Sequence, residues 1–379
     1  MSGVILKPGK EKSILKRHPW IFSGAIATFP SFSDGDILPV YSHDHKLLAW
    51  AYFHTKNSLA GRILSFGELS PIEAVKRHIK DAIQLRESLV KTSARRLINA
   101  EGDSLPGLIV DQYNDMLVIQ INTCGMEKLK DLIIKTLIDE LKPLSIYEKS
   151  HSSARKQEGL LESCGLLYGE LIPEVTIVEN DISYIVSITQ GQKTGFFLDQ
   201  REMRKKIAGL SLGKRVLNCF AYSGGFSLSA LKGGALHVDS IEISQDACRL
   251  CERNNFDSSR HTIIQADVFD FLKNSSLNYD IIILDPPAFA KKRGDVEPAC
   301  QGYKEINRRV FQKMPKGSLL LTSSCSAYMT GDLFQNIVFQ AALEADRFVR
   351  IIGRHHQAAD HPIALNHPEG DYLKSLLLC

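Results

Sequence analysis

The class of fold is decided by the stretch Tyr279-Asp280-Ile281-Ile282-Ile283-Leu284-Asp285-Pro286-Pro287-Ala288-Phe289. Its four consecutive apolar residues, bounded by turn signals, predict a central strand that is covered on both faces. Pro286 and Pro287 cannot donate hydrogen bonds to a sheet, so the strand must end there. The Asp285 carboxylate and the Phe289 ring then follow the carboxyl end of a strand, where open α/β sheets bind their ligands. A strand capped by a rigid turn would leave the same pattern, so the rest of the chain has to decide.

Strands and helices alternate around this stretch, from about residue 190 to the end of the chain. The expected strands are 215–219, 237–241, 262–265, 280–284, 318–322, 348–352 and 372–378. The expected helices are 226–232, 245–255, 268–272, 301–313 and 331–344. Five or more βα units predict a doubly wound, mostly parallel sheet. The long connector 353–371 and the last strand predict an antiparallel hairpin at one edge.

The first half of the chain lacks this alternation. Residues 3–67 read as short strands with turns between them, which predicts a small β-barrel. A helix opens at Ser70-Pro71-Ile72-Glu73, which has a cap residue, a proline at the first position and a glutamate that completes a capping box. A second helix is expected at 126–141, among strands and hairpins. We therefore expect three domains, at residues 1–70, 71–188 and 189–379, the middle one of α+β type.

Composition excludes little. The 379 residues carry a net charge of +3, which neither requires nor excludes a nucleic-acid partner. No apolar run is long enough to span a membrane and the start has no signal-peptide core, so we expect a cytoplasmic protein without membrane contact. The eight cysteines are scattered. The lone pair Cys248 and Cys251 has no second pair or histidine at ligand spacing, so no metal site is expected.

Basic and aromatic residues interleave near the start of the chain. They are Lys10, Lys12, Lys16, Arg17, His18, Trp20 and Phe22. Such a mixture can hold a nucleic-acid backbone and stack on bases. It can equally be a charged rim around core aromatic rings, and this segment alone leaves both interpretations open.

Four strand ends of the C-terminal half carry glycines or acids. They are Asn218–Phe226 with its Ser223-Gly224-Gly225 turn, Glu242-Ile243, Asp267-Val268, and Asp285-Pro286-Pro287. The glycines let a ligand approach the backbone, but their spacing fits neither a dinucleotide fingerprint nor a phosphate-binding loop. Glu242 stands where a carboxylate can bind ribose hydroxyls. Asp267 can bond an adenine amine or cap the next helix, or do both. Each acid alone favours a structural role, whereas the ordered series is much more specific.

This series resembles the first four motifs of class I S-adenosylmethionine-dependent methyltransferases. Further matches are 192–201, 323–326, His18–Ile26, and the late residues His361-Pro362 and Pro368–Lys374. Together they make the whole chain similar to the bacterial 23S rRNA cytosine-5 methyltransferases, which consist of a PUA domain, an EEHEE domain and a methyltransferase domain. The resemblance implies an α/β chain with a C-terminal Rossmann-like sheet, an N-terminal PUA-like β-barrel that binds RNA, and a central α+β domain. It also implies a homodimer, which no residue indicates directly.

The same resemblance implies roles for individual residues. Cofactor contacts are assigned to Asn218, Phe220, Ala221, Tyr222, Ser223, Gly224, Gly225, Glu242, Ile243, Asp267, Val268, Asp285 and Gln200. Substrate contacts are assigned to Phe289, Pro286, Pro287, Thr194, Phe197 and Arg201. Phe289 can stack on a base flipped out of its helix or plug the core. Arg201 can pair with a phosphate or with Asp199.

Cys325 is the implied nucleophile. Carbon 5 of cytosine is a poor nucleophile, and a thiolate that adds to carbon 6 makes it reactive. Cys325 follows a strand in a Ser/Thr-rich loop, so it can share one rim of the sheet with Asp285. No cysteine adjoins Pro286 and Pro287, so a mechanism with a single cysteine is implied. Asp285 is expected to hold the cytosine ring, and either Asp285 or a water can remove the proton from carbon 5.

Two other functions compete with this one. The same fold can methylate a ring or exocyclic nitrogen, because Asp-Pro-Pro-aromatic loops also serve amino methylation. A buried, inert Cys325 would fit that reading. The chain can also be a non-catalytic RNA-binding assembly factor, which the acids at 242, 267 and 285 disfavour.

Overall fold

The computed structural model describes residues 3–379, which fall into two compact units. The first unit comprises the chain up to Val175 together with Ser187–Gly195 and Ala359–Gly370. The second comprises Thr176–Val186, Phe196–Ala358 and Asp371–Cys379. Each unit is thus built from separate stretches of the chain. The three domains expected at 1–70, 71–188 and 189–379 stay a prediction.

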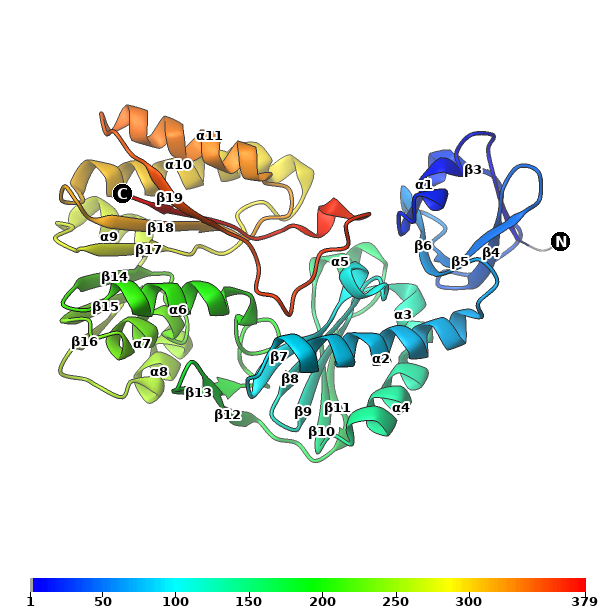
Figure 1. Cartoon of the computed structure of the whole chain (residues 1–379), viewed down its shortest axis with the longest axis horizontal. Helices are drawn as coiled ribbons and strands as arrows, with labels where there is room; N and C mark the ends of the chain where they lie inside the picture. The colour runs from blue at the N-terminus through cyan, green and yellow to red at the C-terminus, as the bar shows by residue number, and fades with distance from the viewer. Residues whose placement is uncertain (1–2) are drawn as a thin grey trace. The chain divides into compact units, whose positions relative to one another are not determined.

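The first unit begins with a six-stranded sheet in the order β2-β6-β5-β4-β1-β3 (Figure 1). Its strands are β1 (Val4–Leu6), β2 (Trp20–Phe22), β3 (Ile26–Thr28), β4 (Ile37–Tyr41), β5 (Leu47–Phe53) and β6 (Leu59–Phe66). The short helices are α1 (Lys12–Leu15) and η1 (Ser23–Ala25). Alternate residues of these strands point inward and form a core of their own, with Val4, Val40 and Phe53 at its centre. The short strands expected here are confirmed.

A five-stranded sheet, in the order β11-β10-β9-β8-β7, forms the rest of the first unit. Its strands are β7 (Ala94–Asn99), β8 (Leu108–Tyr113), β9 (Met116–Ile121), β10 (Ser145–Ser150) and β11 (Ser163–Gly169). Its helices are α2 (Pro71–Leu89), η2 (Ala100–Asp103), α3 (Cys124–Lys128), α4 (Lys130–Leu141) and α5 (Ser153–Gln157). The apolar stripes of α2 and α4 share a core with the strands, where Ile79 and Ile133 meet Val110. The helix expected over 126–141 is wrong in one respect, because the chain breaks at Leu129 into α3 and α4.

The second unit is organised by a seven-stranded sheet in the order β16-β15-β14-β17-β18-β20-β19. The strands are β14 (Arg215–Cys219), β15 (His237–Glu242), β16 (His261–Gln265), β17 (Ile281–Leu284), β18 (Leu319–Ser324), β19 (Ile351–His355) and β20 (Lys374–Leu378). The first five in this order are parallel, and β20 is antiparallel to both β18 and β19. The predicted parallel sheet with an antiparallel hairpin at one edge is confirmed.

Helices cover both faces of this sheet (Figure 1). They are α6 (Arg201–Leu210), α7 (Gly225–Lys232), α8 (Gln245–Asn254), α9 (Val268–Asn274), α10 (Val296–Lys313) and α11 (Gly331–Glu344). The short 3-10 helices are η3 (Leu198–Gln200), η4 (Arg293–Asp295) and η5 (Pro368–Gly370), the last of which lies in the first unit. The helices α9, α10 and α11 bury Leu272, Phe311 and Phe334 against the strands.

Strand order reverses beside β14, and this reversal positions the site. From β14 the chain proceeds outward through β15 and β16, and then returns to the other side of β14 with β17. In open α/β sheets, a crevice for ligands opens at the carboxyl ends of the strands at such a switch point. The loops after β14 and β17 are therefore the expected walls of a binding site.

Two local details complete the fold. The hairpin of β12 (Glu174–Glu179) and β13 (Ile182–Ser187) turns at Asn180 and Asp181, both of which are left-handed. The strand expected at 348–352 lies instead at Ile351–His355. Arg350 exchanges both backbone hydrogen bonds with Cys379, just before β19 begins. Across residues 3–379, none of the helices combines the length and apolar character needed to cross a membrane.

Candidate active site

Asp285 lies directly after the buried strand β17, as the sequence predicts, and is half-buried. Its Oδ1 accepts a 2.9 Å hydrogen bond from Nε2 of Gln200. The other atom of that amide, Oε1 of Gln200, is buried and has no hydrogen-bond partner. A buried acceptor without a donor is costly, so this pair of side chains is suited to a ligand that brings an N–H or O–H group.

The loop after β14 has an unusual backbone. Phe220, Tyr222 and Gly224 are left-handed, with φ of 62°, 47° and 83°. Residues other than glycine, asparagine and aspartate rarely adopt this conformation, and such strain clusters at ligand sites. A Cβ atom on Gly224 would lie 2.6 Å from Sγ of Cys251, so only glycine fits there. The loop leads into α7 at Gly225.

Glu242 holds this loop in place. Its Oε2 accepts a 2.9 Å hydrogen bond from the backbone N–H of Tyr222, and its Oε1 accepts one of 2.9 Å from Ser244. The carboxylate thus organises the turn, and each oxygen keeps capacity to accept a ribose hydroxyl. Ile243, beside it, is 63% exposed and offers an apolar face next to the acid.

Asp267 follows β16 and caps α9, where its side chain accepts a 3.1 Å hydrogen bond from the backbone N–H of Asp270. The capping role is confirmed, and the adenine contact stays a prediction. Val268 is buried in the core between the sheet and α9. It therefore supports the loop rather than presenting its side chain to solvent.

A chain of buried hydrogen bonds runs beneath these loops. Asn218 donates to Ser227, Ser227 bonds Ser240, and Ser240 bonds Nε2 of His261 at 2.7 Å. Burial lowers the pKa of His261 to about 4, so the ring is neutral at physiological pH. The chain crosses three neighbouring strands and α7, and it fixes the rotamer of Asn218 directly before the strained loop.

Cys325 lies directly after β18, next to the loop that contains Asp285. Its Sγ lies 3.8 Å from the carbonyl oxygen of Pro286. Ser326 ties the two loops together, because its Oγ accepts a 3.2 Å hydrogen bond from the backbone N–H of Ala290 and lies 3.2 Å from the Tyr303 hydroxyl. The thiol is half-buried, whereas Ser324 and Ser326 on either side are fully buried. The rim that the sequence predicts for Asp285 and Cys325 is therefore present.

Other thiols of the second unit are in different surroundings. Burial raises the pKa of Cys251 to about 12 and raises that of Cys219 still further above its ordinary value. Both side chains are buried in the core. A protonated thiol without solvent access is unreactive, so neither Cys219 nor Cys251 is suited to act as a nucleophile.

The comparison with protein families identifies the family of this chain. Residues 148–362 match the family of S-adenosylmethionine-dependent methyltransferases, and residues 4–66 match the PUA-like domain. The chain belongs to the S-adenosylmethionine-dependent methyltransferase family. The C-terminal Rossmann-like sheet and the N-terminal PUA-like domain expected from the sequence are confirmed.

Relatives extend the match over the whole chain. A protein of Aeromonas hydrophila named ribosomal RNA large subunit methyltransferase I is 41% identical over 392 residues, covering 100% of this chain and 99% of its own. Among solved structures, a candidate S-adenosylmethionine-dependent methyltransferase from Streptococcus mutans has a TM-score of 0.85 at 26% identity. A second candidate methyltransferase, complexed with SAH, has a TM-score of 0.87 at 26% identity. In both cases 100% of each chain is covered. This chain is therefore a member of the ribosomal RNA large subunit methyltransferase I family within the methyltransferases.

The groups around the β14 loop fit the cofactor of this methyltransferase. Gly224, which has no room for a Cβ atom, lets the cofactor approach the turn. Glu242 has spare capacity to accept ribose hydroxyls, and the exposed Ile243 offers an apolar face to the base. The expected cofactor is thus S-adenosylmethionine. The Phe220–Gly225 loop, Glu242, Ile243 and Asp267 stay the predicted contacts of this cofactor.

Several expected substrate residues have other partners. Thr194 belongs to the first unit, where its buried hydroxyl donates a 2.6 Å hydrogen bond to Asp111 and lies 3.1 Å from the Tyr113 hydroxyl. Arg201 forms an ion pair with Glu179 at 3.4 Å. The sequence predicts a phosphate or Asp199 as the partner of Arg201, and Glu179 is not among these predicted partners.

Two aromatic rings in the second unit differ in what they contact. Phe289 packs against Tyr303, with 4.6 Å between ring centroids, and against the core below β17. This is the core-plug alternative that the sequence left open, and stacking on a base stays a prediction. Phe197 lies edge-on to Tyr222 at 5.2 Å, so it does adjoin the loop after β14.

Residues that the sequence gave no role also border the site. Tyr372 donates a 2.7 Å hydrogen bond to Asp199, next to Gln200. Lys374 donates a 2.9 Å hydrogen bond to the carbonyl oxygen of Ser326, next to Cys325. Both residues belong to the late motif Pro368–Lys374 that the sequence shares with the family. The motif alone does not indicate what these side chains contact.

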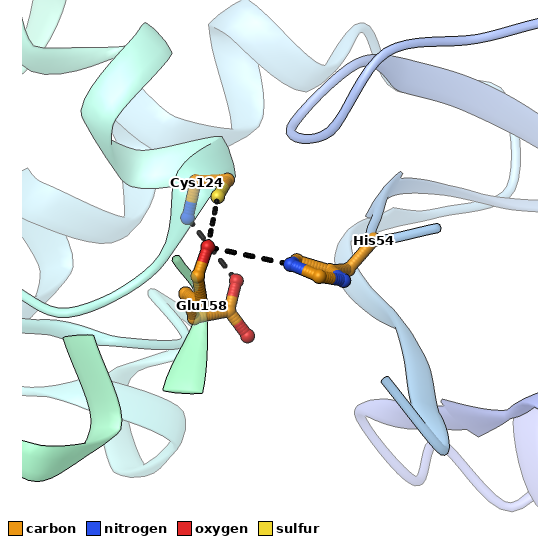
Figure 2. A group of neighbouring side chains, drawn as sticks. All are labelled: His54, Cys124 and Glu158. Atoms are coloured by element: carbon orange, nitrogen blue, oxygen red, sulfur yellow. Dashed lines mark hydrogen bonds between the residues drawn. The ribbon is translucent and has the colours of Figure 1, made fainter. Parts of the chain in front are cut away.

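A second cluster, in the first unit, has the residue types of a metal site. Figure 2 shows His54, Cys124 and Glu158 converging. The thiol of Cys124 donates to the carbonyl oxygen of Glu158 at 3.2 Å, and Nε2 of His54 lies 3.3 Å from the same oxygen. Nδ1 of His54 accepts from the backbone N–H groups of Lys56 and Asn57. Neutral His54 therefore carries its proton on Nε2, the nitrogen that a metal would need.

The charges of this cluster also favour a set of hydrogen bonds over a metal site. Arg62 forms a 2.8 Å ion pair with Glu158 and already neutralises its carboxylate. Burial raises the pKa of Cys124 to about 11, so its thiol is protonated. The group is a set of hydrogen bonds that joins the β5–β6 turn to α3 and the segment after α5.

Proposed function

We propose that this methyltransferase modifies carbon 5 of a cytosine in 23S rRNA through a covalent bond to Cys325. The observation that carries the proposal is the half-buried Cys325 thiol beside the Asp285-Pro286 loop at the switch point of the sheet. A nitrogen methyltransferase needs no thiol there. The name of the Aeromonas hydrophila relative, a large-subunit ribosomal RNA methyltransferase, supports the substrate class.

The residues divide the work as follows. S-adenosylmethionine supplies an electrophilic methyl group when it is bound. The Cys325 thiolate adds to carbon 6 of the ring, which turns carbon 5 into a nucleophile. Asp285, oriented by Gln200, holds the cytosine ring through a hydrogen bond that favours a protonated ring nitrogen during the attack. After carbon 5 has been methylated, Asp285 or a water takes its proton, and the electrons of that C–H bond form the C5–C6 double bond as the bond between Sγ and carbon 6 breaks and regenerates the thiolate.

Nucleoside analysis tests this proposal. Ribosomal RNA that lacks the modification is incubated with the protein and S-adenosylmethionine, digested to nucleosides and examined by mass spectrometry. The proposal expects 5-methylcytidine and its loss in Cys325→Ala. A methylated nitrogen, formed equally by Cys325→Ala, would instead establish the nitrogen methyltransferase. Failure to bind S-adenosylmethionine in calorimetry would support the non-catalytic assembly factor.

RNA binding is assigned to the PUA-like domain. A groove in this domain is lined by Lys10, His18, Trp20 and the half-exposed Phe22, so basic and aromatic groups do share one surface. Such a surface can pair with phosphates and stack on bases. Lys10→Gln should weaken RNA binding and flatten its dependence on salt in filter binding, because one phosphate contact is lost.

We further propose a homodimer in the cytoplasm. In the second unit, α11 and the edge strand β19 border an apolar groove that exposes Phe339, Leu343 and Phe348. Exposed apolar surface beside an unpaired strand edge favours a protein partner, and a second copy is the partner that the resemblance implies. Light scattering should give a dimer mass for the wild type and a monomer mass for Phe339→Glu. A monomeric wild type would refute the dimer.

A further inference from the structure

The antiparallel pairing of β18 with β20 places a lysine beside the nucleophile loop. Lys374 is the register partner of Ser324, the last residue of β18, and Cys325 follows directly. The Lys374 ammonium donates hydrogen bonds to the carbonyl oxygens of Ser326, at 2.9 Å, and Tyr372, at 2.8 Å. The cation is therefore anchored to the residue after Cys325.

This position is an expensive one for a charge. Lys374 is only 5% exposed, and both acceptors of these hydrogen bonds are neutral carbonyl oxygens. Burial lowers the pKa of Lys374 to about 8. An apolar side chain of similar length would fill the same space without that cost. A lysine at so costly a position suggests a use for its charge in the neighbouring loop.

The charged form of Cys325 is the group that such a cation would act on. Two other titratable groups bear on this pair. The carboxylate of Asp371 favours the Lys374 cation, and the Tyr303 hydroxyl of α10 lies 3.2 Å from Oγ of Ser326, the residue after Cys325. The negative charge of Asp371 offsets part of the positive charge of Lys374. The acceptors of the two Lys374 hydrogen bonds are nevertheless backbone carbonyl oxygens. A cation held near a thiol favours the thiolate, which is the nucleophilic form.

We propose that Lys374 is a positioning residue that stabilises the Cys325 thiolate and fixes the Ser324–Ser326 loop for attack. The proposal rests on the proposed covalent function of Cys325. It extends that function to Lys374 on β20, whose two hydrogen bonds go to Ser326 and Tyr372.

The test measures the thiol itself, without RNA or methyl transfer. The full-length protein is alkylated with iodoacetamide between pH 6 and pH 10, and modification of Cys325 is followed by peptide mass spectrometry. Lys374→Gln, which keeps an N–H donor without the charge, should raise the midpoint of the alkylation profile by about one pH unit. Lys374→Arg keeps the charge and should leave the midpoint near that of the wild type.

Lys149 provides a matched control. It too is buried, donates to two backbone carbonyl oxygens, those of Ile188 and Gly191, and has a pKa that burial lowers to about 8. It lies in the first unit, so Lys149→Gln should leave the Cys325 profile unchanged. If Lys374→Gln does not fold, Lys374→Arg and Lys374→Met replace it as the charged and uncharged pair.

The possible outcomes separate this inference from the proposed function. Identical midpoints for the wild type and Lys374→Gln would overturn the role of Lys374, even if 5-methylcytidine forms. A raised midpoint in Lys374→Gln would support the role, whatever base atom is methylated. A midpoint raised equally by Lys149→Gln would overturn it, because a general loss of stability would then explain the shift.

Discussion

Gln200 donates a 2.9 Å hydrogen bond from its side-chain amide to the carboxylate of Asp285. The two residues come from different segments, η3 and the loop after β17, and meet at the carboxyl end of the sheet. This hydrogen bond fixes the orientation of the carboxyl group at the edge of the sheet. The site is thus prepared before a ligand arrives, and the predictions below follow from such contacts.

Removal of the amide at position 200 should reduce methyl transfer. Gln200→Leu keeps the volume but loses a hydrogen bond to a charged group, worth about 1.5–3 kcal/mol. We expect a ten- to hundredfold lower kcat/KM, with a melting temperature close to that of the wild type, as measured with radiolabelled S-adenosylmethionine. Gln340→Leu, on the exposed side of α11, is the control and should keep full activity.

The glycine that opens α7 should tolerate no side chain. Gly224→Ala combines a left-handed backbone with a Cβ atom 2.6 Å from Cys251, so it should destabilise the protein by more than about 1 kcal/mol and weaken S-adenosylmethionine binding in calorimetry. Gly209→Ala, in α6 with open space around it, should instead stabilise by about 0.5–1 kcal/mol. Equal effects of the two substitutions would contradict the steric argument.

His261 should make stability depend on pH. Its pKa is lowered by burial to about 4 from 6.5, so between these values the unfolded chain binds a proton that the folded chain does not. The free energy of unfolding should therefore fall as the pH drops from about 6.5 to about 4, by at most about 3 kcal/mol, and then level off. Denaturant titrations should show that the free energy of unfolding falls less with pH in His261→Gln than in the wild type. In His43→Gln, which replaces an exposed side chain, it should fall as much as in the wild type.

The His54–Cys124–Glu158 cluster should behave as a set of hydrogen bonds. Dialysis against EDTA should leave the melting temperature unchanged, because the proton on Nε2 of His54 occupies the position of a metal. Cys124 should resist iodoacetamide at pH 8 while the exposed Cys164 reacts. Stoichiometric zinc in the purified protein, together with a lower melting temperature after EDTA, would show that a metal ion displaces this proton.

Sequence reasoning located this site through strand ends. Short apolar runs that end in turn residues predict the strands before Glu242, Asp267, Asp285 and Cys325. Parallel strands bring such ends to one edge of the sheet. The same reasoning missed the partners of Arg201 and Lys374. Glu179 and Ser326 are brought to them by the β12–β13 hairpin and by antiparallel β20, pairings that no local pattern specifies.

The covalent role of Cys325 is tested most directly by trapping its adduct. RNA that contains 5-fluorocytosine cannot release the enzyme, because fluorine at carbon 5 blocks the removal of a proton there. With S-adenosylmethionine present, the wild type should form an RNA–protein species that survives denaturing electrophoresis, with the link mapped to Cys325, and Cys325→Ala should form none. An adduct of equal yield in Cys325→Ala, or none in a wild-type protein that still forms 5-methylcytidine, would contradict the account.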